Sequence, residues 1–171
     1  MRFLERLQAT DLETHLVVTK SAEMTLAYET DKTLTYLRSL ATVTYANRDI
    51  GAAIASGSFP THGMVIAPCS IRTLSEIATG VTSSLLTRTA DVTLKERRRL
   101  VLMVRETPLH LGHLRSMTAV TEMGGIVMPP VPGFYTKPQT IADIIDHTLN
   151  RVMDLVGIDP GPVPRWGETI S

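Results

Sequence analysis

Hydroxyl side chains stand at two points where an apolar run gives way to a segment with helical periodicity. Thr19 ends the run at 15–19, and Ser70 and Thr73 follow the run at 63–67. The first N–H groups of a helix have no partner within it, and its dipole is positive at the same end, so such a junction suits a phosphate. A single junction is explained as well by a helix cap, worth about 1 kcal/mol. Two such junctions in one chain favour an anion site.

Two charged residues, Arg105 and Glu106, follow a third apolar run at 100–104. The guanidinium of Arg105 offers a planar fork of donors that matches phosphate oxygens. Glu106 has two possible roles: it is either a partner in a structural salt bridge or a group that transfers a proton during a reaction. The residue types leave both roles open.

Histidine and cysteine give weaker signals. His110 and His113 have the spacing of a metal-binding pair on one helix face, but no third ligand is evident in the sequence, so no metal site is predicted. Cys69 has no histidine or second cysteine close to it and is predicted to be a small packed residue. Surface or packing roles are assigned to the remaining histidines, His15, His62 and His147.

Short apolar runs alternate with longer amphipathic stretches along the chain. The runs lie at 15–19, 42–46, 63–67, 100–104 and 125–128. The stretches with helical periodicity lie at 20–30, 73–79, 84–97, 110–123 and 138–156. Such alternation is typical of strand and helix units that build a parallel sheet. We expect an α/β fold with a doubly wound, Rossmann-like parallel sheet in three α/β/α layers, which binds ligands at the carboxyl ends of its strands.

Composition limits the remaining possibilities. With 171 residues, 43% of them hydrophobic, the chain is predicted to form one domain over 1–156, followed by a Pro/Gly-rich tail over 157–171. Lys plus Arg and Asp plus Glu both number 17, so neither nucleic acid nor a membrane is an expected partner. A single cysteine, no signal-peptide pattern and no membrane-spanning run favour a cytoplasmic location.

Three long motifs, "GMVIAPCSIRTLSEIATG", "LLTRTADVTLKERRRLVLMVRETPLHLGHLRSM" and "VMPPVPGFYTKPQTIADIIDHTLNRVMDLVGI", carry a family resemblance. From about Leu12 to Trp166 the chain resembles the UbiX-type flavin prenyltransferases, within the flavin-binding decarboxylase-like flavoproteins. The resemblance implies that a dimethylallyl group passes from dimethylallyl phosphate to reduced FMN. The prenylated FMN then serves a UbiD-type decarboxylase, as in ubiquinone biosynthesis. The resemblance also implies a large homo-oligomer, a dodecamer, in which neighbouring chains complete each site.

Position by position, the resemblance implies two binding sets and no metal. The FMN set consists of Thr19, Ser70, Ile71, Arg72, Thr73 and Arg105. The set for the phosphate of the prenyl donor consists of Tyr135, Arg151, Lys95 and Arg88. Glu106 and Tyr135 are implied as catalytic. Lys95 is the only member of the run "KERRR" at 95–99 that the resemblance selects, and the run's arginines are predicted to form a solvated helix end.

The chain departs from this family at its beginning. Family members open with a strand and a Gly-rich, Ser-containing turn around the flavin phosphate. This chain opens "MRFLERLQATDLETH" and has no glycine before Gly51. Backbone N–H groups approach a phosphate closely along a Gly-rich path. We therefore expect the first strand and its loop to be missing, and the chain as given to bind flavin poorly and to fail in the full reaction.

Two alternative functions stay open. One is oxidative decarboxylation of a peptidyl or pantothenoyl cysteine on the same fold, but that branch carries a Pro-x-Met-Asn-x-x-Met-Trp segment where this chain has "MPPVPGFYTKP" with Tyr135. The other is a catalytically silent subunit for assembly or partner binding, suggested by the missing first unit. The residue types also do not decide whether the prenyl donor is a monophosphate or a diphosphate.

Overall fold

The computed structural model describes residues 1–163, 165 and 167. Its strands are β1 (His15–Val18), β2 (Val43–Ala46), β3 (Gly63–Cys69), β4 (Arg99–Val104) and β5 (Ile126–Val127). Its helices are α1 (Arg2–Leu7), α2 (Lys20–Glu29), α3 (Leu34–Ser39), α4 (Ile71–Ala78), α5 (Leu85–Lys95), α6 (Leu111–Glu122) and α7 (Ile141–Val156), with a 3₁₀ turn η1 at Ala53–Ala55. Each predicted apolar run is a strand, and the predicted three-layer α/β/α fold is confirmed. Trp166 and part of the predicted tail lie outside the described residues.

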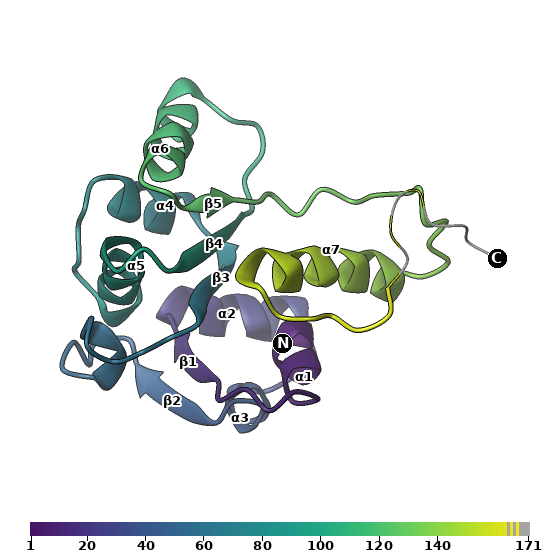
Figure 1. The fold of residues 1–171 in the computed structure, drawn as a ribbon, viewed down its shortest axis with the longest axis horizontal. Helices are drawn as coiled ribbons and strands as arrows, with labels where there is room; N and C mark the ends of the chain where they lie inside the picture. Colours follow the sequence, from purple (N-terminus) through teal and green to yellow (C-terminus); the bar gives the residue numbers. More distant parts are fainter. Residues whose placement is uncertain (164, 166, 168–171) are drawn as a thin grey trace.

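Every hydrogen-bonded pair of strands is parallel (Figure 1). The ladders join β1 to β2 in one group and β3, β4 and β5 in that order in another. Among the described residues no ladder joins the two groups, so β1 and β3 each have a hydrogen-bonded neighbour on one side only. Because the strands are parallel, their carboxyl ends face the same edge, where β3 leads into α4 and β4 leads into Arg105.

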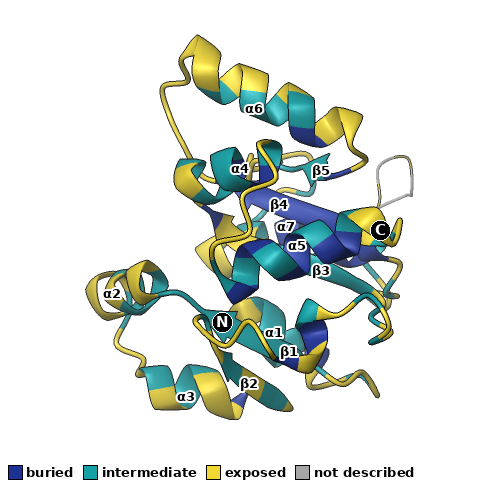
Figure 2. Ribbon diagram, turned by 90° about the vertical axis from the view of Figure 1, so that its left-hand side faces the viewer, coloured by how far each residue is buried: buried dark blue, intermediate teal, exposed yellow. Residues whose placement is uncertain are grey.

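The core is built on both faces of β4, which Figure 2 shows as a buried ribbon between helices. Alternate side chains of a strand point to opposite faces. Leu100, Leu102 and Val104 pack in a cluster with residues of α4, α5 and α6. Val101 and Met103 pack in a second cluster with α7. The near-continuous apolarity of the run is therefore explained by helices on both sides.

Side-chain caps fix where the later helices begin. The Thr140 hydroxyl accepts a hydrogen bond from the backbone N–H of Asp143 (3.1 Å), and the Asp143 carboxylate accepts one from the backbone N–H of Thr140. This reciprocal cap starts α7 at Ile141 rather than at 138. Gly157, with a φ of 75°, ends it in the left-handed region that glycine tolerates best. In the part of the chain that the structure describes, no helix has the length and apolarity to cross a membrane.

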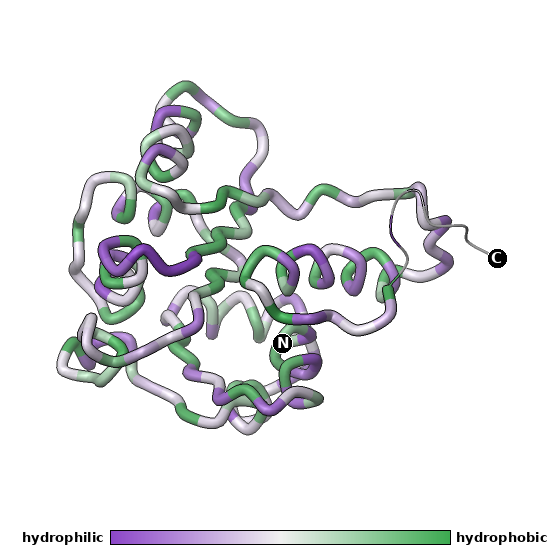
Figure 3. Tube along the Cα trace, in the orientation of Figure 1, coloured by the Kyte–Doolittle hydropathy of each residue, from purple (hydrophilic) through white to green (hydrophobic). Residues whose placement is uncertain are grey.

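The segment "KERRR" does not form the solvated helix end that its charge predicts. The helix α5 stops at Lys95, and Arg99 already belongs to β4, so the hydrophilic stretch runs directly into the strand (Figure 3). Arg98 donates hydrogen bonds to the carbonyl oxygens of Gly57 and Phe59, both at 2.8 Å. Arg97 and Arg99 are exposed, as predicted, but the prediction was wrong for Arg98, because the loop after η1 supplies acceptors that the local sequence cannot reveal.

Leu102 tests the two-sided core. Its side chain has no exposed area, so Leu102→Ala should lower the free energy of unfolding by about 2–5 kcal/mol through lost burial and a cavity. Leu12→Ala, at a site that is 39% exposed, should change it by no more than about 0.5 kcal/mol. Urea unfolding at one fixed protein concentration measures both variants, and equal losses would contradict this description of the core.

Candidate functional site

The ends of β3 and β4 are joined where the predicted flavin residues begin. The backbone N–H of Arg105 donates to the carbonyl oxygen of Cys69 at 3.2 Å. The next residue, Ser70, caps α4 by accepting from the N–H of Thr73 (3.2 Å), and the two hydroxyl oxygens lie 3.1 Å apart. The hydroxyl pair and the start of α4 therefore lie beside the chain segment that carries Arg105.

Helix α2 extends this group of residues across the carboxyl edge of the sheet. Thr19 caps its first turn by accepting from the N–H of Ala22 at 3.1 Å. At the other end, Glu29 Oε1 accepts a hydrogen bond from Arg105 at 3.1 Å. Because α2 has 10 residues, its ends lie about 15 Å apart, and the helix spans from the end of β1 to the end of β4.

Ile71 and Arg72, the first residues of α4, take different positions. Ile71 packs its partly buried side chain against the core cluster of β3 and β4, and its backbone N–H lies in the first turn of α4. Arg72 is largely exposed and pairs with Glu76 one turn along the helix at 2.9 Å. A surface pair of this kind contributes little to stability, so its guanidinium can leave Glu76 at small cost.

Glu106 lies in the exposed segment after β4. One of its carboxylate oxygens accepts a hydrogen bond from the backbone N–H of Thr107 at 3.1 Å. Arg105 is paired with Glu29. The structural role that the sequence left open, a salt bridge between Arg105 and Glu106, is therefore taken by a different carboxylate.

Tyr135 and Arg151 meet at a cavity of about 260 Å³ beside α7. The hydroxyl of Tyr135 lies 2.7 Å from Nε2 of His147. Arg151 pairs with Asp154 at 2.7 Å, and Arg165 holds the same carboxylate with a two-pronged contact at 2.9 Å on each oxygen. Arg165, and then Arg151, keep the pKa of Asp154 below its usual value despite partial burial.

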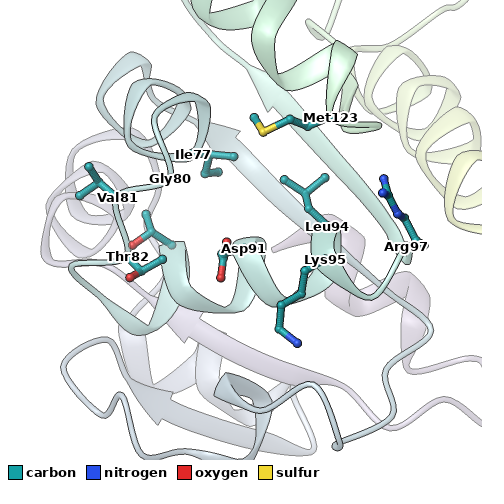
Figure 4. Close-up of a pocket in the computed structure, with 10 residues that line it drawn as sticks. Ile77, Gly80, Val81, Thr82, Asp91, Leu94, Lys95, Arg97 and Met123 are labelled. Carbon is teal, nitrogen blue, oxygen red and sulfur yellow. The ribbon is translucent and has the colours of Figure 1, made fainter.

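Lys95 and Arg88 lie elsewhere in the chain, on α5. Lys95 lines a second cavity of about 250 Å³, together with Asp91 and Arg97 (Figure 4). Lys95 is also paired with its neighbour Glu96. Arg88 bonds to Asp91 at 2.8 Å and to the carbonyl of Ala55 at 3.2 Å. Neither residue lines the cavity of Tyr135 and Arg151, so a single chain holds the predicted phosphate set in two separate groups.

The histidine pair at the start of α6 forms a helix cap. The rings of His110 and His113 stack with centroids 3.5 Å apart. Each ring accepts a backbone hydrogen bond through Nδ1, His110 from Gly112 and His113 from His110. Over the described residues no cluster of three or more potential metal ligands occurs.

Sequence patterns did not single out His147 or Glu29, which contact Tyr135 and Arg105. His147 and Arg151 are one helical turn apart on α7, and that spacing was the available signal. No local signal links Glu29 to Arg105, because 76 positions separate them.

Nearly the whole chain is similar to known flavoproteins. The family model described as Flavoprotein matches residues 1–153. The chain is 58% identical to flavin prenyltransferase UbiX of Escherichia coli K12, over 92% of this chain and 84% of that relative. The structure of AnUbiX (PadA1) in complex with FMN and dimethylallyl pyrophosphate matches with a TM-score of 0.95 and 46% identity, covering 98% of this chain and 89% of that one. A dodecameric FMN-dependent UbiX-like decarboxylase from Escherichia coli O157:H7 matches with a TM-score of 0.94 and 41% identity, over 98% and 91% of the two chains.

Cys69, at the end of β3, is packed as predicted, with no exposed area. Burial raises the pKa of its thiol to about 12. Only the thiolate reacts with alkylating agents, so iodoacetamide at about pH 8 should label the native protein at least about a thousandfold more slowly than the urea-unfolded chain. Mass spectrometry follows the labelling, with Cys69→Ser as the blank. Similar rates in the two states would contradict a buried, protonated thiol.

Proposed function

Because this chain belongs to the flavoprotein family and, within it, to the UbiX-type flavin prenyltransferases, we propose that it joins a dimethylallyl group from dimethylallyl phosphate to reduced FMN. The structural observation that carries the proposal is the cavity in which Tyr135 and Arg151 meet, because a phenol and a guanidinium suit a phosphate leaving group. The product is prenylated FMN, and a UbiD-type decarboxylase is its proposed recipient.

The residues at the carboxyl edge of the sheet fit FMN by the chemistry of their donors. The start of α4 offers unpaired N–H groups beside the hydroxyls of Ser70 and Thr73. Arg105 adds a positive charge and has one exposed partner, Glu29. We assign Thr19, Ser70, Ile71, Arg72, Thr73 and Arg105 to FMN. Bound there, reduced FMN supplies the ring system to which the dimethylallyl group is attached.

Tyr135 and Arg151 hold the phosphate of the donor in this proposal, and Lys95 and Arg88 complete the set from a neighbouring chain. The separation of the two groups within one chain supports this arrangement. The solved UbiX-like relative from Escherichia coli is dodecameric. We propose the same homo-oligomer here, so that α5 of one chain faces α7 of another.

Glu106 is proposed to take up the proton that the flavin loses when the attached dimethylallyl group closes a fourth ring on FMN. Its carboxylate is exposed at the end of β4, next to Arg105, and has a single hydrogen bond to backbone. A positioned general base contributes about 10²–10⁴-fold to such a step. Phosphate released from the donor is the competing base. The residue types do not decide whether Glu106 or this phosphate takes the proton.

The two alternative functions are not favoured. Relatives that are 53–58% identical over most of the chain carry the name flavin prenyltransferase, which neither a cysteine decarboxylase nor a silent subunit explains. The expectation that this chain holds flavin weakly stays a prediction, and FMN titration of the purified protein measures it directly.

Glu106→Gln separates the base from the binding residues. The amide keeps the size of the side chain but cannot accept a proton, so prenylation should slow by about 10²-fold or more while FMN affinity changes little. Mass spectrometry of the flavin, after incubation with reduced FMN and dimethylallyl phosphate, measures the reaction. Thr107→Ala is the matched neighbour control. A wild-type chain that holds FMN under the assay conditions but never adds a five-carbon unit to it refutes the proposed function, and an unchanged rate in Glu106→Gln refutes the role of Glu106.

A further inference from the structure

Tyr135 and His147 form a closely held pair at the rim of the cavity. The Tyr135 hydroxyl lies 2.7 Å from His147 Nε2, and the rings meet edge to face with centroids 5.1 Å apart. The backbone at Gly133 lies against both rings, because a Cβ there would be 3.2 Å from His147 Cε1 and 3.3 Å from Tyr135 Cε1. The loop before α7 therefore keeps the phenol within reach of the imidazole.

The hydrogen bond between them can run in either direction, and the direction decides what the phenol offers to an anion. A tyrosine hydroxyl has one proton, and a neutral imidazole can accept it at Nε2. The phenol then has only oxygen lone pairs to present to another ligand. This arrangement disfavours binding of a phosphate oxygen, which is also an acceptor. A protonated imidazole always carries a proton on Nε2, whereas the neutral ring does so in only one of its two tautomers. With that proton the imidazole donates to the phenol oxygen, and the phenol proton becomes available to the phosphate.

We propose that His147 is a positioning residue for the donor's phosphate, which in its protonated form turns the Tyr135 hydroxyl into a hydrogen-bond donor. Anion binding in this cavity is then coupled to uptake of one proton by His147. The inference rests on the proposed function, which assigns Tyr135 and Arg151 to the phosphate, and it adds the residue that sets the direction of the tyrosine hydrogen bond.

The charged groups around His147 are engaged with other partners. Asp154, on the same helix, is held by Arg151 and Arg165. Asp143, one turn earlier, accepts the backbone N–H groups of Gln139 and Thr140 at 2.9 and 2.8 Å.

On the side where α1 packs against α7, Asp146 is held by Arg2 at 2.8 Å and faces Arg6 at 3.9 Å. Asp143, Asp146 and Asp154 all have pKa values below the usual one and stay ionised near neutral pH, so none of them changes charge there.

Sulfate tests the coupling without a titrating ligand, because it stays a dianion across the pH range in which histidine titrates. Equilibrium dialysis of radiolabelled sulfate against the assembled full chain, with FMN present, gives its affinity at each pH. We expect the affinity to be about fivefold or more higher at about pH 6 than at about pH 8. In Tyr135→Phe and in His147→Phe the affinity should be lower at pH 6 and should no longer depend on pH.

His62→Gln is the matched control, since it removes a histidine outside the cavity and should leave the wild-type pH dependence intact. The proposal is overturned if wild-type affinity is the same at both pH values, if no sulfate binds at pH 6, or if His147→Phe keeps the dependence. Should His147→Phe not fold, Tyr135→Phe gives the same decision. Prenylation measured on the same preparations separates the two claims. Turnover with pH-independent sulfate binding refutes only the coupling, and coupled binding without turnover refutes only the proposed function.

Discussion

Burial of β4 on both faces is the constraint on which the site depends. Leu100, Leu102 and Val104 are covered by the helices on one face of the sheet, and Val101 and Met103 by α7 on the other. A strand enclosed in this way has no room for an unpaired charge, since burying one costs many kcal/mol. Polar chemistry is therefore possible only where the strand ends, and Arg105 and Glu106 follow immediately after Val104.

The same enclosure decides what surrounds that end. The helix α4 must pack on one face through Leu74 and Ile77, which places its capped first turn, with Ser70 and Thr73, beside Arg105. The helix α7 packs on the other face mainly through its second half, leaving Arg151 and His147 toward the cavity that Tyr135 enters from the preceding loop. The core contacts that hold α4 and α7 are therefore enough to place the binding residues that each helix carries.

Elements with strong local signals were predictable from the sequence, and contacts between distant segments were not. The apolar runs marked every strand, and the most continuous of them, at β4, reflects burial on both faces. The helix α3 was missed because six residues are too few to show a helical period. Arg98 was misassigned, and His147 was given only a surface or packing role. Their partners, the carbonyls of Gly57 and Phe59 and the hydroxyl of Tyr135, are set by the tertiary fold. The sequence likewise does not show that Lys95 and Tyr135 line different cavities, because the packing of α5 and α7 in the folded chain decides this.

A structure of the assembled protein with FMN and dimethylallyl phosphate tests the central claim most directly, because it locates the phosphorus atom relative to two chains. The account predicts that Tyr135 and Arg151 of one chain hold the phosphate, that Lys95 of a second chain lies within hydrogen-bond reach, and that FMN lies against Ser70 and Arg105. A phosphate bound in the cavity that Lys95 lines within its own chain, with Tyr135 and Arg151 making no contact, would contradict it.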